Sequence, residues 1–322
     1  MAPADPAPAA SAADADEDRY RRAERRLWDS LRVVPTEHRV RLDSLGCEVR
    51  IQQVGDGEPV LFLHGASTAG TSWAGLAAAL PGWCCLLVDR PGTGLSEPLT
   101  RVPRDAVGMQ ALGAALLPAL LDALALDRAA IVATSLGGYF ALRGALAAPE
   151  RVRCLVELGW TPAAGSDGVP AFMRLGSVPV LGRLMAAAPA NDASVRRMFR
   201  QIGLRQALDA GRVAPEAIAS YAALLNHTPT MRNELALGRA VVSPLGGLDP
   251  QLALSPGEQA ALAMPVLVAW GDGDPFGSLA VAHRFADGFP DGRLVEIPGA
   301  GHAPWMDDAE HAARLVREFL IA

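Results

Sequence analysis

The sequence predicts an α/β protein in which a mostly parallel, twisted sheet carries helices on both faces and a helical segment is inserted between two strands. Short apolar runs typical of buried strands alternate with helical patterns from Val60 to Leu158. The alternation stops at Trp160, after which Gly and Pro interrupt a series of helical patterns. At Pro265 a strand pattern begins again. A single sheet built from both flanking parts, with an all-helical cap between them, accounts for this order.

The composition is that of a globular chain with a large core. Half of the 322 residues are hydrophobic, and the formal net charge is -6. The chain can therefore bury a sizeable core, and a nucleic-acid-binding surface is not expected. Lysine is absent, so arginine carries all of the basic charge.

The cysteines and the start of the chain favour a cytoplasmic protein. The N-terminus lacks the basic start and apolar stretch of a signal peptide. The richest apolar stretch, residues 111–126, contains Pro118 and Asp122, so no membrane span is expected. The cysteines lack metal-ligand spacing, and we expect free thiols and no metal or organic cofactor. They are Cys47, Cys84, Cys85 and Cys154.

The elements follow in order along the chain. Residues 1–18 have little to bury and predict a disordered tail, and residues 20–31 predict a short helix. Alternating residues then predict an edge hairpin over 38–52. Residues 19–160 and 263–322 are expected to form the core, and residues 161–262 the helical cap. Further strands are predicted over 60–63, 84–88, 129–132, 152–158, 265–270 and 293–297, and core helices over 104–126, 137–148, 280–289 and 307–320.

Residues 131–140 carry the first chemical signal. An apolar strand runs into a turn with Ser135 at its apex, and a helical pattern follows at once. A strand that reverses into a helix around one serine needs small neighbours, because the two backbones otherwise collide. Gly137 and Gly138 supply that room after Ser135, and Ala133 nearly does so before it. Alone, the same pattern is also typical of a plain turn or a helix N-cap.

A base and an acid are expected in loops that follow strands. His302 lies in a Gly-rich loop after the final strand, from which an imidazole can reach the serine turn. Asp274 follows the preceding strand and can orient that imidazole. Asp272 is interpreted as a turn residue that bonds its own backbone. Glu157, on the strand before the cap, is a third possible acid.

Oxyanion donors are expected beside the serine. Small residues after the first buried strand let the Ala66 N–H point into the crevice, and the Leu136 N–H begins the following helix. His64 is interpreted as structural. The Gly-rich segment that starts at Asp89 lacks the pattern of a phosphate-binding loop and is interpreted as a turn that shapes the pocket.

These segments resemble the landmarks of the α/β-hydrolase family over residues 36–160 and 263–322. They are Leu-Phe-Leu-His-Gly from Leu61, Val-Asp-Arg-Pro-Gly-Thr-Gly-Leu-Ser from Val88, Val-Ala-Thr-Ser-Leu-Gly-Gly from Val132, Trp-Gly-Asp-Gly-Asp-Pro from Trp270 and Pro-Gly-Ala-Gly-His-Ala-Pro-Trp from Pro298. The resemblance implies nucleophile Ser135, base His302, acid Asp274, and oxyanion donors Ala66 and Leu136. Ala133 departs from the family's usual first glycine, and its methyl group slightly crowds the turn.

The predicted function is a serine hydrolase that cleaves a carboxylic ester, or a related acyl bond, of a small and apolar substrate through an acyl-enzyme. A C–C bond hydrolase of the same family uses the same residues and stays open as an alternative. A non-hydrolytic ligand receptor or isomerase on this fold is a third. The cap sequence around Phe172 and Met185 is apolar, which suits either a substrate pocket or packing beneath the cap.

Overall fold

The computed structural model describes residues 12–321 and contains one eight-stranded sheet in the order β1-β2-β4-β3-β5-β6-β9-β10. The strand β2 pairs antiparallel with β1 and β4, whereas the remaining pairs are parallel. The predicted fold class is confirmed, and the edge hairpin forms as expected. The sheet strands are β1 (Thr36–Leu42), β2 (Cys47–Val54), β3 (Glu58–Leu63), β4 (Trp83–Val88), β5 (Ala129–Ala133), β6 (Val152–Leu158), β9 (Val266–Gly271) and β10 (Gly292–Ile297).

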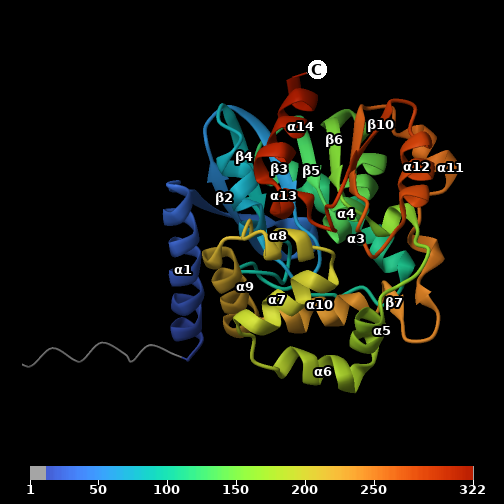
Figure 1. Cartoon of the computed structure of the whole chain (residues 1–322). Coiled ribbons are helices and arrows are strands. Elements are labelled where there is room, and N and C mark those ends of the chain that lie inside the picture. Colours follow the sequence, from blue (N-terminus) through green and yellow to red (C-terminus); the bar gives the residue numbers. More distant parts are fainter. Residues whose placement is uncertain (1–11, 322) are drawn as a thin grey trace, which may run out of the picture.

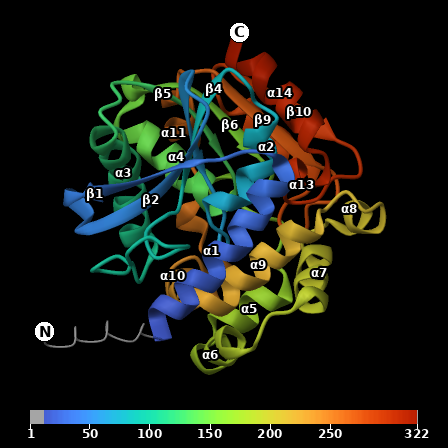
Figure 2. The same ribbon diagram turned by 90° about the vertical axis from the view of Figure 1, so that its left-hand side faces the viewer.

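Helices cover both faces of the sheet (Figures 1 and 2). On one face α3 (Ala106–Ala123), α4 (Ser135–Ala147) and α12 (Leu279–Asp287) contribute to one apolar core. On the other face α1 (Ala12–Leu31), α2 (Ala74–Ala78) and α14 (Ala309–Ile321) contribute to a second core. Since alternate residues of a strand face opposite sides, each buried strand feeds both cores.

Of the seven helices between β6 and β9 in the chain, we call the first six the cap helices. They gather beyond one edge of the layered core, at the lower part of Figure 1. A short antiparallel pair, β7 (Val242–Ser243) with β8 (Gly247–Leu248), follows them and was not predicted. The cap helices are α5 (Ala171–Ser177), α6 (Pro179–Ala187), α7 (Asp192–Gln201), α8 (Arg205–Asp209), α9 (Pro215–His227) and α10 (Thr230–Gly238).

Three expectations about boundaries need correction. The disordered tail predicted over 1–18 is wrong for residues 12–18, because α1 begins at Ala12; residues 1–11 lie outside the described part. The helix α11 (Pro256–Ala261), expected in the cap, packs on the core: Arg143 of α4 bonds Glu258, and Gln259 donates to the Phe285 carbonyl of α12. The closing helix is divided at Asp308 into α13 (Pro304–Asp307) and α14.

The helix α3 is the one helix within residues 12–321 with the length and mean hydropathy of a membrane span. Core helices of globular proteins also have these properties. In this protein α3 packs against α4 and buries Met109, Leu116 and Leu120 in the core. Pro118 and Asp122 both lie inside α3 and do not break it, in agreement with the single helix predicted over 104–126.

Candidate active site

Ser135 occupies a strained turn between β5 and α4. Its φ angle is 53°, which lies in the left-handed region that side chains other than glycine rarely adopt. Gly137 makes the turn possible, because a Cβ there would lie 2.1 Å from the Leu63 carbonyl oxygen of β3. A Cβ on Gly65 would lie 3.0 Å from the Cβ of Ser135, so the loop after β3 also passes close to the serine. The turn therefore presents Ser135 at the ends of the central strands.

His302 and Asp274 form a buried pair. His302 Nδ1 lies 2.8 Å from Asp274 Oδ2. The same carboxylate accepts the Trp160 N–H at 2.9 Å through Oδ2 and the Phe276 N–H at 3.0 Å through Oδ1. These backbone donors fix the Asp274 carboxylate, which in turn selects the His302 tautomer with a proton on Nδ1. The Nε2 atom is then free to accept a proton.

Aromatic rings hold the imidazole from the side. The Phe276 ring lies 4.4 Å from the His302 ring, edge to face, and Trp160 stacks on Phe276 at 5.2 Å. On the cap side, the backbone N–H of His302 donates to the Ile202 carbonyl oxygen at 2.9 Å. The position of His302 therefore depends on both the core and the end of α7.

Asp272 lies in the same turn as Asp274 but does not contact His302. It is exposed, and its Oδ1 accepts the Gly299 N–H at 2.7 Å. The expectation that Asp272 bonds its own backbone is wrong, since it ties its turn to the His302 loop instead.

Glu157 also lies apart from the His302–Asp274 pair. It is completely buried on β6, opposite Ala133 of β5, and faces the Ser135 turn. Burial raises the pKa of its carboxyl well above the ordinary value, and the nearby Ser135 N–H only partly offsets this. Neither carboxyl oxygen has a hydrogen-bond partner of ordinary geometry in the described structure. Burial without an ordinary hydrogen-bond partner therefore favours the neutral form of Glu157 behind the serine.

The expected oxyanion residues Ala66 and Leu136 line the cavity next to Ser135. His64 is buried and lies outside this lining. The Nε2 atom of His64 accepts the backbone N–H of Arg90. Burial and the charge of the Arg90 side chain hold the pKa of His64 well below the ordinary value. Arg90 also donates to the carbonyls of His64 and Gly65. The turn that starts at Asp89, which was interpreted as a structural turn that shapes the pocket, supports the Ala66 loop from outside the cavity lining.

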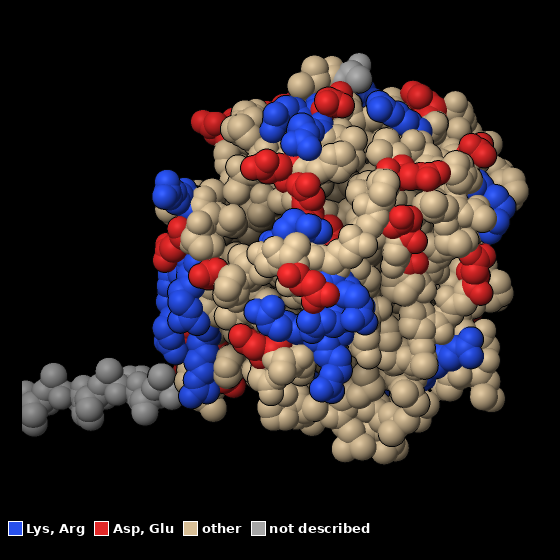
Figure 3. Space-filling model, in the orientation of Figure 1, with Lys and Arg blue, Asp and Glu red and all other residues tan. Residues whose placement is uncertain are grey.

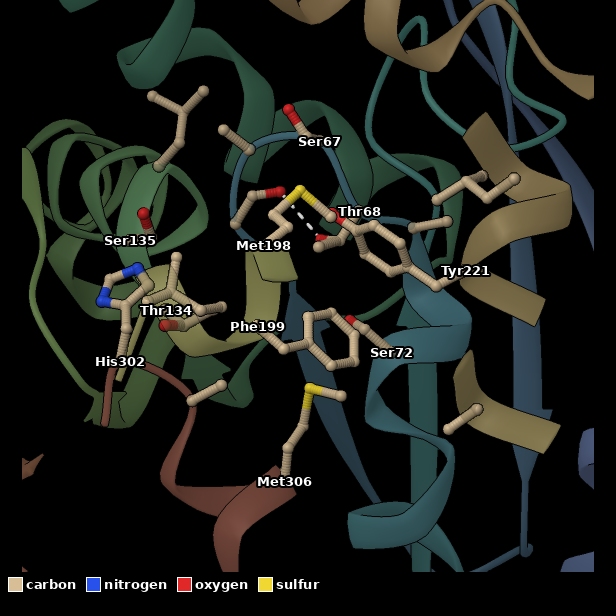
Figure 4. Close-up of a pocket in the computed structure, with 18 of the residues that line it drawn as sticks. Ser67, Thr68, Ser72, Thr134, Ser135, Met198, Phe199, Tyr221, His302 and Met306 are labelled. Carbon is tan, nitrogen blue, oxygen red and sulfur yellow. Dashed lines mark hydrogen bonds between the residues drawn. The ribbon is translucent and has the colours of Figure 1, made fainter. Parts of the chain in front are cut away.

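A cavity of about 570 Å³ opens over Ser135 and His302. Figure 4 shows these two side chains beside each other at one end, with Phe199, Ser72 and Met306 farther along. Most of its lining is apolar. Arg212 is the one arginine among the described lining residues, and its Nε donates to the Asp307 carbonyl oxygen.

The structure adds site residues that the sequence pattern did not indicate. Glu234 of α10 lines the cavity and binds Arg90 at 3.1 Å, and it accepts the Ser67 N–H at 3.2 Å. This contact joins the cap helices to the Ala66 loop. No sequence signal links Arg90 and Glu234, which lie far apart in the chain.

The apolar residues of α5 and α6 divide between two environments. Phe172 and Met173 line the cavity, Val180 and Leu184 are exposed to solvent, and Met185 both lines the cavity and is exposed. The lower edge of Figure 3, where α6 lies, is accordingly mostly free of charged side chains. Thr134 and Tyr139 flank the Ser135 turn. Thr134 lines the cavity, whereas Tyr139 is buried and lies outside the lining.

This fold, with a serine after β5, an acid after β9 and a histidine after β10, defines an α/β-hydrolase. The chain belongs to the α/β-hydrolase-fold family, whose sequence pattern matches residues 58–309, and it is a hydrolase. The fold expected from the sequence motifs is thereby confirmed.

The chain is similar in sequence or in structure to several named hydrolases. A 2-hydroxy-6-oxononadienedioate/2-hydroxy-6-oxononatrienedioate hydrolase of Burkholderia vietnamiensis is 29% identical over 289 residues, which cover 85% of this chain and 92% of that one. Carboxylesterase CesB from Bacillus subtilis superimposes with a TM-score of 0.72 at 19% identity, covering 95% and 98% of the two chains. The 2-hydroxy-6-oxo-6-phenylhexa-2,4-dienoate hydrolase of Rhodococcus sp. strain RHA1 gives 0.71 at 20% identity, covering 90% and 100%. At such identities the structural likeness concerns the fold.

Proposed function

We propose that the protein hydrolyses a carbon–carbon bond next to a ketone in a small, largely apolar substrate, with Ser135 as nucleophile. The observation that carries this proposal is the 2.8 Å His302–Asp274 pair beside Ser135 at one end of the apolar cavity. The sequence relative named as a 2-hydroxy-6-oxononadienedioate hydrolase supports the type of bond. This choice differs from the ester hydrolysis expected first from the sequence.

The first half of the reaction uses the Ser135 hydroxyl. His302 Nε2 takes its proton while Oγ attacks the ketone carbon, and the resulting oxyanion accepts the N–H groups of Ala66 and Leu136. Collapse of this adduct breaks the carbon–carbon bond. The departing carbon needs a conjugated carbonyl that can hold the electron pair as an enolate, and His302 returns its proton to that fragment.

The second half consumes one water molecule. His302 takes a proton from water, the hydroxide attacks the acyl-Ser135 ester, and the carboxylic acid leaves as Oγ regains the proton. Asp274 orients the imidazole of His302 and stabilises the imidazolium in both halves. The sum is one water added across one carbon–carbon bond.

The cavity lining argues for a substrate with few charges. A dioate carries two carboxylates, yet Arg212 is the one arginine among the described lining residues, and its Nε is already bonded to Asp307. Burying an unpaired carboxylate against an apolar wall is costly. We therefore expect a substrate with at most one carboxylate and an apolar remainder.

Ester hydrolysis is the second candidate, because the same residues cleave an ester with an alkoxide as the leaving group. The apolar lining favours it as much as it favours an apolar ketone.

The test compares both bond types in one protein. Purified enzyme is mixed with 2-hydroxy-6-oxohexa-2,4-dienoates that carry methyl, phenyl or carboxyethyl at C6, and with p-nitrophenyl esters. We expect the wild-type enzyme to remove the dienol absorbance and Ser135→Ala to abolish this loss. The phenyl compound should be turned over faster than the carboxyethyl compound. Turnover of esters alone would refute carbon–carbon cleavage, and turnover unaffected by Ser135→Ala would refute the nucleophile.

A further inference from the structure

The N-terminal helix α1 forms one wall of the cavity, although it precedes the residues that match the family. Tyr20, Leu27 and Leu31 of α1 line the same cavity as Ser135. The family match covers residues 58–309, so these wall residues come from a segment that precedes it in the chain. Figures 1 and 2 show α1 lying along α9, and the two helices pack against each other.

The two sides of α1 differ in chemistry. Its solvent side carries exposed arginines, among them Arg22, Arg25 and Arg26. Basic side chains form a column at the left of Figure 3, where α1 lies in Figure 1. Its inner side buries Ala23, Leu27 and Trp28. The helix therefore presents apolar side chains to the cavity and charge to water, as an amphipathic helix on a globular core does.

A buried ion-pair network fixes α1 to the core. Both carboxylate oxygens of Glu24 accept hydrogen bonds from the Arg50 guanidinium, at 2.8 and 2.6 Å, and Arg50 Nε donates to Asp89 at 2.8 Å. All of these side chains are buried. Because undocking α1 would leave Arg50 without its Glu24 partner, the wall is a fixed part of the site.

Other elements line the part of the cavity that lies against this wall, and we call this part of the cavity the α1 arm. Ala74 of α2, Phe199 of α7, and Tyr221 and Leu224 of α9 also line the cavity on this side. The cavity wall formed by α5 and β7, with Met173 and Val242, lies on the other side of the molecule from α1 in Figure 1. The cavity thus offers two separate apolar walls to a substrate held at Ser135.

We infer that the α1 arm is the subsite for an extended apolar chain, alkyl or aryl, of the substrate attached to the carbonyl carbon. This inference rests on the proposed attack by Ser135 and adds to it the substrate class and the segment that selects it. An apolar chain gains affinity in proportion to the surface it removes from water, about three- to fourfold for each buried methylene.

The test measures binding without requiring turnover. Alkyl trifluoromethyl ketones from propyl to decyl form reversible adducts with a nucleophilic serine, and calorimetry gives a Kd for each. In the wild type, affinity should rise about threefold or more per methylene until the arm is full. In Leu31→Trp, the propyl ketone should bind as before while the gain with chain length disappears.

Matched variants distinguish binding of the chain in the α1 arm from binding at the wall formed by α5 and β7. Asp29→Trp places the same ring on the solvent side of α1 and should keep the wild-type series. In Met173→Trp, which fills the other wall, loss of the gain with chain length would place the chain there and overturn the inference. Leu31→Ala, which keeps the helix intact, should extend the longest chain that still gains affinity.

Failure of the two proposals gives different results. Equal slopes in wild type and Leu31→Trp would overturn the α1 arm while leaving Ser135 as nucleophile. Equal propyl ketone affinities in the wild type and Ser135→Ala would overturn the nucleophile, and the dependence on chain length would still report on the arm.

Discussion

The carboxyl group of Glu157 occupies the space that a side chain on Gly138 would need. A Cβ on Gly138 would lie 1.9 Å from Glu157 Oε2 and 2.2 Å from Oε1. The two glycines after Ser135 therefore have different tasks. Gly137 lets α4 approach the β3 backbone, whereas Gly138 makes room for a buried acid behind the Ser135 turn.

Gly138→Ala should lower the stability of the protein by about 1–3 kcal/mol, because the methyl group must displace a packed, buried side chain. Urea unfolding followed by circular dichroism measures the change. Gly257→Ala is the control, since its Cβ would meet nothing within 4 Å in α11 and should leave stability equal or slightly higher. Equal losses in both variants would contradict this account of Gly138.

Glu157→Gln should become more stable relative to the wild type as the pH rises. Burial raises the folded-state pKa of Glu157, so from about pH 4.5 upward the unfolded chain releases the proton more readily than the folded chain does. The wild type therefore loses stability over this range, and glutamine removes that loss. Unfolding free energies between pH 4 and 8 check this, and a constant difference would refute a neutral Glu157.

Asp274→Asn should lower kcat by roughly 10³–10⁴-fold, because an amide no longer holds His302 in the required tautomer. Asp272→Asn is the matched control in the same turn. It can still accept the Gly299 N–H through its amide oxygen, so kcat should change by no more than a few-fold. Steady-state kinetics on the best substrate found decide the assignment, and the reverse order would make Asp272 the acid.

Arg50→Met should cost about 3–5 kcal/mol of stability, since it leaves Glu24 and Asp89 buried without their cation. Arg21→Met removes the partly exposed ion pair between Arg21 of α1 and Glu37 of β1 and should cost at most about 1 kcal/mol. Denaturant midpoints compare the two. Similar midpoints would show that α1 is not fixed through Arg50.

Asp307→Asn should change the pH dependence of stability between about pH 4 and 6. Burial raises the pKa of Asp307 to about 6, so the wild type loses stability over this interval as the pH rises, and the asparagine variant lacks this loss. Asp307 Oδ2 accepts the Gly301 N–H at 2.8 Å, next to His302. Melting temperatures of both proteins across this interval measure the difference, which should stay constant above pH 7.

The sequence by itself determined the order of strands and helices and the positions of the chemical groups. Apolar runs such as Val60–Leu63 and small residues around Ser135 are local signals, because strand burial and a tight turn restrict the residue types at each position. Loops after parallel strands meet at one edge of a sheet, so His302 and Asp274 could be assigned to a common site from their places in the chain.

Tertiary structure alone decided what surrounds these residues. Pairs such as Arg90–Glu234 and Glu24–Arg50 join segments far apart in the chain, and no local pattern encodes such contacts. The same holds for Glu157, which the sequence offered as a possible acid and the fold buries behind Ser135. The helix at residues 20–31 was predictable from spacing, yet its place as a cavity wall follows from packing against α9 and α2. Local propensity specifies elements, whereas burial of their apolar faces against distant partners specifies the site.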